Sequence, residues 1–485
     1  MPEAIARRPH RPLFWPETVS QLQAIVAEFD QPVFLVGGAV RDALAGRPVH
    51  DIDLALADGG VRASRRIANA LGGHCYVLDR KRDVGRALLD VGQAQIRIDV
   101  ARFRGPDLHA DLLDRDFTIN AMAVELAGNC DLLIDPLDGE VDLKARRLRQ
   151  CHGDSLANDP LRAMRALRLA AQFGFQIERN TLNSMRPLRE RLVTCSAERI
   201  RDEFWRLLEL PQASAAIRAA AATGVLDVLM PELAGLRHRP ASGEDYGDGW
   251  QECLAILERL QHVVSAFTGR LGDGHGASFG AGMLVMQLNR WRAALQQHLQ
   301  TTWPDQRAHR ALLVLGGLYS VQGRADVNAA QAVVRAKAFC LSNAECDRLE
   351  RMLRWQDEVL SLDAGSDLSL HRFWRGAGDA GVDACLLAAA GYLGRTGSRL
   401  DHEEWLNRVG RIAHILQARF EQMDSLINPP PLLDGHGLMR ELSLSPGPLV
   451  GDVLDHIREA QVSGTVGTKE EALALARNLL AADIG

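Results

Sequence analysis

The spacing of apolar residues changes along the chain and separates a mixed N-terminal part from a long helical remainder. Before residue 145, short apolar runs and segments of alternating apolar and polar residues are interleaved with helical spacings. From Asn158 onward, apolar residues recur every three or four positions almost to the end of the chain. These patterns predict an α+β unit with a mixed β-sheet, followed by an all-helical region.

The same spacings predict the individual elements. In the first part we expect helices over residues 20–29, 61–71 and 141–145, and strands over residues 33–36, 51–54, 75–78, 86–91 and 95–102. In the second part we expect helices over residues 158–173, 198–205, 250–267, 283–299, 307–318, 329–340, 344–355, 384–393 and 402–420. Residues 432–480 should form a compact final segment of short helices separated by glycines.

A strand, a glycine pair, a helix and a second strand form the most informative stretch of the sequence. Gly37 and Gly38 end the strand over residues 33–36 and begin the helix. In the strand that follows, Asp51 and Asp53 point to one face because successive strand residues alternate. Two carboxylates repel each other unless a cation lies between them. Beside a glycine turn, they predict a site for a divalent metal and a nucleotide.

A third carboxylate lies in the middle of the strand over residues 95–102. Alternation places Ile98 on one face and Asp99 on the other. A carboxylate in mid-strand either meets water at a sheet edge or belongs to a metal site. Asp51 and Asp53 favour the second interpretation.

Two further segments are rich in polar groups. Arg115, Asp116, Thr118 and Asn120 can hydrogen-bond a sugar hydroxyl, although capping of a helix is the simpler interpretation from sequence alone.

Asp159 and Arg162 lie three residues apart at the start of a predicted helix. An intrahelical ion pair is the simpler interpretation of this spacing. The alternative is a base reader, because a carboxylate accepts from the amino group of cytosine or adenine and a guanidinium donates to the adjacent ring nitrogen. Guanine and uracil would place a carbonyl oxygen against the carboxylate and be excluded.

Composition narrows the class of protein. The 485 residues suffice for more than one domain, and 47% apolar and 24% charged residues are ordinary for a soluble protein. No run approaches the roughly 18 apolar residues of a membrane span. The eight cysteines form no CxxC and no zinc-like spacing, so we expect a cytoplasmic protein with no zinc and no membrane association. The net charge of −6 argues against a uniform nucleic-acid-binding surface, but residues 141–206 carry 14 Lys and Arg against 8 Asp and Glu.

Taken together, these motifs resemble those of the class II tRNA nucleotidyltransferases, a superfamily that also holds the bacterial poly(A) polymerases. Five matching segments occur in family order: residues 35–42 with 51–53, 115–121, 135–143, 158–170 and 198–203. Residues 431–448 resemble the tail of these enzymes more weakly, and residues 212–428 match no motif. The resemblance implies a catalytic head over residues 1–145, a base-recognising neck over 146–235, a body over 236–428 and a tRNA-binding tail over 429–485.

The resemblance also implies a role for each candidate residue. Asp51 and Asp53 would bind two Mg²⁺ ions, and Asp99 would be a third catalytic carboxylate. The nucleotide would be bound by residues of four motifs: Gly37, Gly38, Arg41, Arg115, Asp116, Thr118, Asn120, Asp159, Arg162, Arg165 and Arg168. Among these, Asp116, Thr118 and Asn120 would select ribose. Asp159 and Arg162 would pair with CTP and then with ATP.

Three departures from the family pattern bear on function. Asp114 stands where the family often has Arg, and Asn158 stands where Glu is common. Only residues 104–110 separate Phe103 from Asp111, where members that complete CCA usually carry a longer flexible loop. We therefore expect CCA addition to tRNA 3′ ends from CTP and ATP. The alternatives are addition of CC only, poly(A) polymerase activity, and an inactive RNA-binding homologue.

Overall fold

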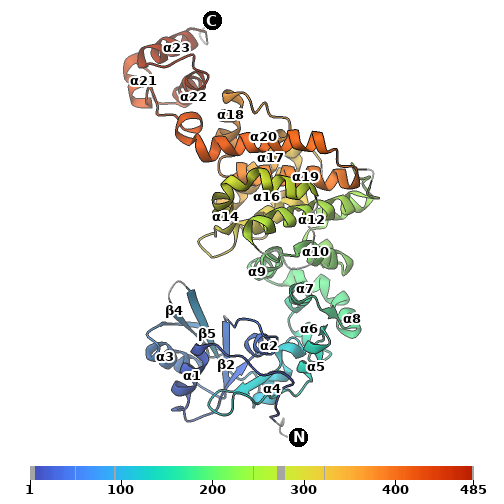
Figure 1. Ribbon diagram of the computed structural model, residues 1–485. Coiled ribbons are helices and arrows are strands. Elements are labelled where there is room, and N and C mark those ends of the chain that lie inside the picture. The colour runs from blue at the N-terminus through green and yellow to red at the C-terminus, as the bar shows by residue number, and fades with distance from the viewer. Residues whose placement is uncertain are drawn as a thin grey trace. The chain divides into compact units, whose positions relative to one another are not determined.

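The computed structural model describes residues 6–49, 51–91, 94–243, 245–269, 279–321 and 323–482. The chain divides into two compact units, residues 1–203 with 219–229 and residues 204–218 with 230–485. The first unit contains a mixed sheet and the second is helical (Figure 1). The expected α+β class is therefore confirmed. The four-part division into head, neck, body and tail stays a prediction.

A six-stranded sheet organises the first unit. Its strands are β1 (Val33–Val36), β2 (Asp51–Leu56), β3 (His74–Asp79), β4 (Val84–Val91), β5 (Ala94–Arg102) and β6 (Ala123–Glu125). Their order across the sheet is β3-β4-β5-β2-β1-β6, with β2 and β5 parallel and the other neighbours antiparallel. The strands β7 (Arg147–Leu148) and β8 (Gln176–Ile177) form a separate parallel pair.

One face of this sheet is covered and the other carries the candidate carboxylates. The helix α3 (Gly60–Ala70) packs under β3 and β4, where Ser64 Oγ lies 3.4 Å from Cys75 Sγ. A Cβ atom on Gly85 would overlap the Ser64 side chain, so this glycine lets helix and strand approach closely. Ile52 and Ile98 are buried, which confirms the alternation predicted for β2 and β5.

Eight further helices belong to this unit or lead out of it. They are α1 (Glu17–Val26), α2 (Gly38–Leu44), α4 (Leu108–Leu113), α5 (Gly139–Lys144), α6 (Ser155–Asn158), α7 (Leu161–Phe173), α8 (Arg179–Leu188) and α9 (Ala197–Leu208). The predicted stop of α7 is confirmed, because Gly174 follows it with a φ of +67° that favours glycine.

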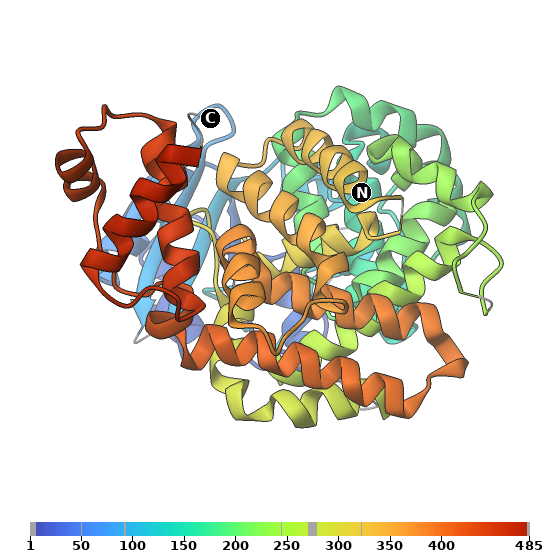
Figure 2. The same cartoon turned by 90° about the horizontal axis from the view of Figure 1, so that it is seen from above.

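The remaining helices follow in chain order. They are α10 (Ala213–Ala222), α11 (Val225–Leu229), α12 (Gly249–Thr268), α13 (Phe279–Leu288), α14 (Arg292–Gln300), α15 (His309–Tyr319), α16 (Ala325–Ala338), α17 (Asn343–Val359), α18 (Asp367–Ala377), α19 (Ala380–Thr396), α20 (His402–Glu421), α21 (Gly435–Leu442), α22 (Pro448–Val462) and α23 (Lys469–Ala482). In Figure 2, α21, α22 and α23 form a group of their own, and they share a core that includes Leu438 and Val453.

The prediction of one helix over residues 283–299 is wrong. The α-helix ends at Leu288, a 3₁₀ turn covers Asn289–Trp291, and a new helix begins at Arg292. The Asn289 side chain accepts a hydrogen bond from Arg292 Nε at 2.8 Å inside this turn. Asparagine offers the backbone such local alternatives to a continuous helix.

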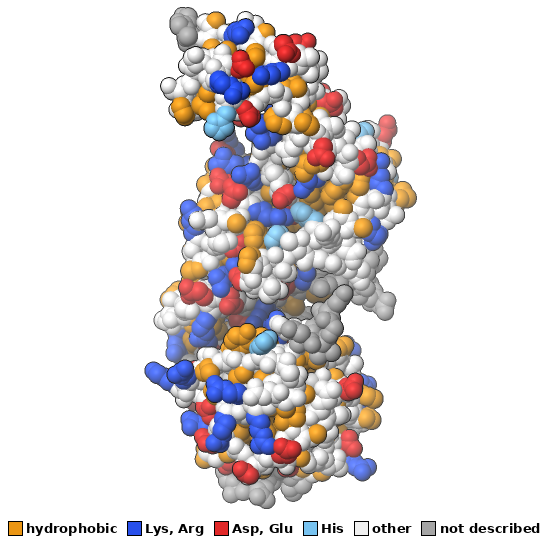
Figure 3. All heavy atoms as spheres, turned by 90° about the vertical axis from the view of Figure 1, so that its left-hand side faces the viewer, with side chains coloured by type: hydrophobic (Ala, Val, Ile, Leu, Met, Phe, Trp, Pro, Cys, Tyr) orange, Lys and Arg blue, Asp and Glu red, His pale blue; other side chains and the backbone are white. Residues whose placement is uncertain are grey.

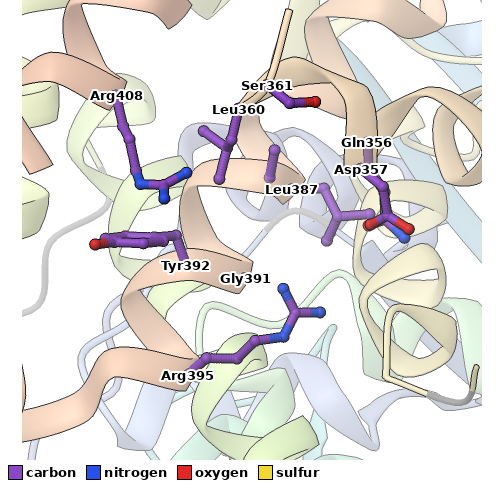
Figure 4. A pocket seen from close by; sticks show the side chains of 10 residues that line it. Gln356, Asp357, Leu360, Ser361, Leu387, Gly391, Tyr392, Arg395 and Arg408 are labelled. Carbon is purple, nitrogen blue, oxygen red and sulfur yellow. The ribbon is translucent and has the colours of Figure 1, made fainter. Parts of the chain in front are cut away.

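A cavity of about 470 Å³ opens among α17, α19 and α20 in the second unit (Figure 4). Its cations already have carboxylate partners, since Arg395 pairs with Glu252 at 3.1 Å and Arg408 with Glu404 at 2.5 Å. None of the site residues predicted from sequence lines it. In the described part of the chain, no helix combines the length and apolarity that crossing a bilayer would require.

Candidate active site

The three candidate carboxylates meet on the open face of the sheet. Parallel pairing of β2 and β5 places Asp53 opposite Asp99, and Asp51 opposite Arg97. Paired residues of adjacent strands share a face. Asp51 is exposed, whereas Asp53 and Asp99 are partly buried. The strand register thus brings together two motifs that are more than forty residues apart in sequence.

Electrostatics at this point favour a bound cation. Burial raises the pKa of Asp53 to about 6; the nearby Arg115 opposes this rise, and the negative charges of Asp99 and Asp51 add to it. Among the described residues, no group of three or more His, Cys, Asp and Glu is arranged to hold a metal ion. The pair Asp51 and Asp53 still fits Mg²⁺, which commonly takes one or two carboxylates and fills its other positions with water and phosphate oxygens.

Asp99 has a partner that the sequence did not indicate. Arg86 of β4 lies opposite Asp99 in the antiparallel ladder, and its guanidinium grips the carboxylate with Nε–Oδ1 and Nη2–Oδ2 distances of 2.7 and 2.8 Å. Such a bidentate pair fixes the orientation of the carboxylate. Finding it requires the β4–β5 register, which no local pattern supplies.

Gly37 leaves space directly beside Asp53. Its φ is +73°, and a Cβ atom there would lie 3.0 Å from Arg115 Nη1 and 3.2 Å from Asp53 Oδ2. Arg115 is held in place by Asp111, whose Oδ2 accepts from Nε at 3.1 Å and from Nη2 at 2.9 Å. Asp111 is 2% exposed and was missed from sequence, although its spacing of four residues before Arg115 on a helix is a known pairing signal.

Arg41 lies nearby but already has several partners. Its guanidinium donates to both Asp42 oxygens at 2.9 Å and to Asn120 Oδ1 at 2.7 Å, and it lies over the Phe173 ring. A Cβ atom on Gly38 would lie 3.2 Å from Arg41 Nη2. The structure therefore places Arg41 in a buried network that joins α2 to the segment containing Asn120.

Asp116 is the centre of the next part of this network. Its Oδ1 accepts from Asn120 Nδ2 at 3.1 Å and its Oδ2 from Arg165 Nη1 at 3.1 Å. Burial acts to raise the pKa of Asp116, but Arg165 and the hydrogen bonds outweigh it and lower that pKa. Thr118 is fully buried and donates its hydroxyl proton to Asp142 at 2.7 Å. This contact orients the segment from inside.

Two arginines of α7 share one carboxylate. Glu203 Oε1 accepts from Arg165 Nη2 at 3.3 Å, and Glu203 Oε2 accepts from Arg168 Nε at 3.1 Å. Glu203 is 7% exposed, so these pairs lie away from bulk water. Glu203 of α9 and Asp116 together hold Arg165 in one position.

Asp159 and Arg162 are not bound to each other in the described structure. Asp159 Oδ2 accepts from Arg199 Nη2 at 2.7 Å, and its other oxygen accepts from the Leu161 amide at 3.2 Å. The Arg162 guanidinium donates to the backbone carbonyls of Asp114, Ser155 and Arg115 at 2.9, 2.9 and 3.2 Å. Among the described partners of the two residues there is no intrahelical ion pair of the kind that the spacing alone suggested. Both side chains are instead fixed by surrounding elements.

Comparison with known proteins agrees with this site. Residues 33–149 match the family described as "Poly A polymerase head domain", and residues 174–236 match "Probable RNA and SrmB- binding site of polymerase A". Over 442 residues the chain is 32% identical to the CC-adding tRNA nucleotidyltransferase of Geobacter sulfurreducens, covering 90% of each protein. It is 32% identical over 454 residues to the A-adding tRNA nucleotidyltransferase of Deinococcus radiodurans, covering 91% of this chain and 94% of the relative.

Solved structures share the fold. A CCA-adding enzyme in complex with CTP matches with a TM-score of 0.62 and 21% identity, over 97% of this chain and 99% of that one. The complex with ATP gives the same TM-score and 22% identity, over 96% and 95%. The fold and its carboxylate-bearing sheet are those of a nucleotidyltransferase. With its sequence relatives, they show that the chain belongs to the family of tRNA nucleotidyltransferases and poly(A) polymerases, and is an enzyme of that class.

Proposed function

We propose that this enzyme adds nucleotides to the 3′ ends of tRNA, using CTP and ATP to build CCA. The observation that carries the proposal is the juxtaposition of Asp53 and Asp99 in register, with Asp51 two residues away on the same face. The names of the relatives, which act on tRNA as CC-adding or A-adding enzymes, support the choice of substrate.

Asp51 and Asp53 would hold Mg²⁺. Two bound ions would lower the pKa of the RNA 3′-hydroxyl and neutralise charge on the α-phosphate during in-line attack. Asp99, fixed by Arg86, would face the attacking hydroxyl. Gly37 would let the triphosphate approach the backbone, and Arg115 would place positive charge beside it.

Base choice would rest on Asp159 and Arg162. Their fixed positions support this role, because a side chain that is already held loses little freedom when it binds a base. A carboxylate and a guanidinium side by side accept from and donate to cytosine or adenine. Asp116 and Asn120, which are hydrogen-bonded to each other, would contact the ribose, and Thr118 would position them from the core.

CC-only addition is a second candidate, favoured by one observation. The segment over residues 104–110 is short and held at both ends, since Asp107 caps α4 by accepting from the Ala110 amide at 2.8 Å and the Arg104 amide donates to Asp111 at 3.0 Å. A segment held in this way has little freedom to act as the flexible loop of CCA-completing members. An enzyme limited to CC would need a partner that adds A.

The catalytic assignment is tested by Asp53→Ala, with Asp58→Ala as a matched control. Asp58 is exposed just after β2 and hydrogen-bonds to Gln31 only through its backbone. We expect Asp53→Ala to lower incorporation of CMP into a tRNA transcript at least about 100-fold, and Asp58→Ala to leave it unchanged. Full incorporation by Asp53→Ala would refute the assignment.

A further inference from the structure

The open face of the sheet continues beyond the carboxylates to an exposed edge. Strand pairing aligns Asp53, Asp99, Arg86 and Tyr76 in one row across β2, β5, β4 and β3. A parallel row joins Asp51, Arg97, Leu88 and His74. Because α3 covers the opposite face, these side chains project from the uncovered one. Figure 1 shows β4, β5 and β2 following one another across this sheet.

The residues of this face combine positive charge with exposed apolar surface. Tyr76 is 53% exposed, and His74 and Arg97 are also exposed. No hydrogen bond or ion pair joins the Arg97 side chain to another described residue. The turn between β3 and β4 adds Arg80, Lys81 and Arg82, all exposed. Cations interleaved with an aromatic ring are what a single RNA strand requires, since phosphates bind the cations and bases stack on the ring.

The chemistry decides which RNA segment this face would meet. Gly37, Arg115, Asp116 and Arg165 all lie toward β1 and β6, on one side of Asp53. In-line displacement brings the attacking oxygen and the leaving group to opposite sides of the phosphorus. If the triphosphate occupies the β1 side, the RNA 3′-hydroxyl must approach from the side of β5, β4 and β3.

We infer that this face, formed by Arg97 of β5, Arg86 of β4 and His74 and Tyr76 of β3, is the track for the last nucleotides of the RNA acceptor strand, with Tyr76 stacking on a base. This rests on the proposed function and names the residues that would hold its second substrate. Three strand spacings separate Tyr76 from Asp53, a distance of about 14 Å. That distance spans about four stacked nucleotides, at roughly 3.4 Å each. Tyr76 therefore lies two to four nucleotides behind the growing end.

The charge of the whole surface argues for a local track rather than a general coating. On the face shown in Figure 3, Lys and Arg side chains are interspersed with Asp and Glu. A protein with net charge −6 gains RNA affinity only where cations are gathered. Arg97 and the turn over residues 80–82 are such a place, and they are continuous with the carboxylates.

The test compares Tyr76→Ala, Tyr76→Phe and Arg97→Ala with the control Arg65→Ala, which removes an exposed arginine from α3, the helix that covers the opposite face. The substrate is a tRNA transcript ending at the discriminator base. We expect Tyr76→Ala to raise the KM for tRNA at least about fivefold and leave the KM for CTP unchanged, because only stacking is lost. Tyr76→Phe keeps the ring and should stay within about twofold of wild type. Arg97→Ala should reduce the salt dependence of tRNA binding by about 0.7 in logarithmic slope.

A KM for tRNA within twofold of wild type in Tyr76→Ala would overturn the inference. If that variant does not fold, wild-type enzyme is cross-linked to transcripts carrying 4-thiouridine at each of the last four positions. A cross-link to the peptide containing Tyr76 supports the track, and cross-links confined to peptides outside β3, β4 and β5 overturn it. Failure of the wild-type enzyme to extend any transcript would instead refute the proposed function.

Discussion

Adding a single methyl group at Gly37 should separate backbone strain from damage to the active site. With φ at +73°, Gly37→Ala costs about 1–2 kcal/mol of unfolding free energy for the positive φ alone. In a unit of about 200 residues, each kcal/mol lowers Tm by about 2–4 °C, so we expect a fall of about 2–8 °C.

The new Cβ atom also reaches the catalytic groups. It would lie 3.0 Å from Arg115 Nη1 and 3.2 Å from Asp53 Oδ2, so both groups must move by a few tenths of an ångström, and the space beside the backbone is filled. Displacements approaching 1 Å at reacting groups cost about 100-fold in rate. We therefore expect kcat/KM for CTP to fall about 10- to 100-fold.

Gly46→Ala is the matched control. Gly46 follows α2 and also has a positive φ, of +65°, but no heavy atom lies within 4 Å of the position that an added Cβ atom would take. This variant should lose similar stability, measured by thermal unfolding, and keep wild-type kcat/KM. Wild-type kcat/KM in Gly37→Ala, or an equal loss in both variants, would refute the reasoning.

Three more outcomes are expected. Asp111→Asn weakens the grip on Arg115 and should raise the KM for CTP severalfold, measured in steady-state assays; an unchanged KM would show that Asp111 does not position this arginine. Ala at Asp159 or Arg162 should relax the preference for C and A over G and U in competition assays, and an unchanged preference would contradict the base-reading role. Because the folded pKa of Asp53 is raised to about 6, its ionisation destabilises the metal-free protein above that pH. Relative to Asp53→Asn, wild type in EDTA should therefore become more stable as pH falls from 7 toward 5, and urea unfolding that shows the opposite trend would contradict this.

Much of the head could be predicted because its signals are local. The strand over residues 33–36 has the bounds of β1, and the alternation in β2 and β5 placed Asp51, Asp53 and Asp99 on one face. The short β6 was missed, because three residues carry no recognisable period.

The partners of the candidate residues could not be predicted, because they come from other elements. Arg86 reaches Asp99 through strand register, and Glu203 reaches Arg165 and Arg168 from another helix. Arg199 holds Asp159 from forty residues away. Such contacts depend on tertiary packing, whereas sequence spacing describes only neighbours on one element.

The most direct test of the account uses three tRNA transcripts, ending at the discriminator base, at C and at CC. Each is incubated with wild-type enzyme, Mg²⁺ and CTP, ATP or both, and products are sized to one nucleotide. The account predicts C addition to the first two transcripts and A addition to the third, followed by a stop. A halt after CC, with the third transcript inert to ATP, would reduce the activity to CC addition and assign A addition to a partner. Long A tracts or no products at all would contradict the account.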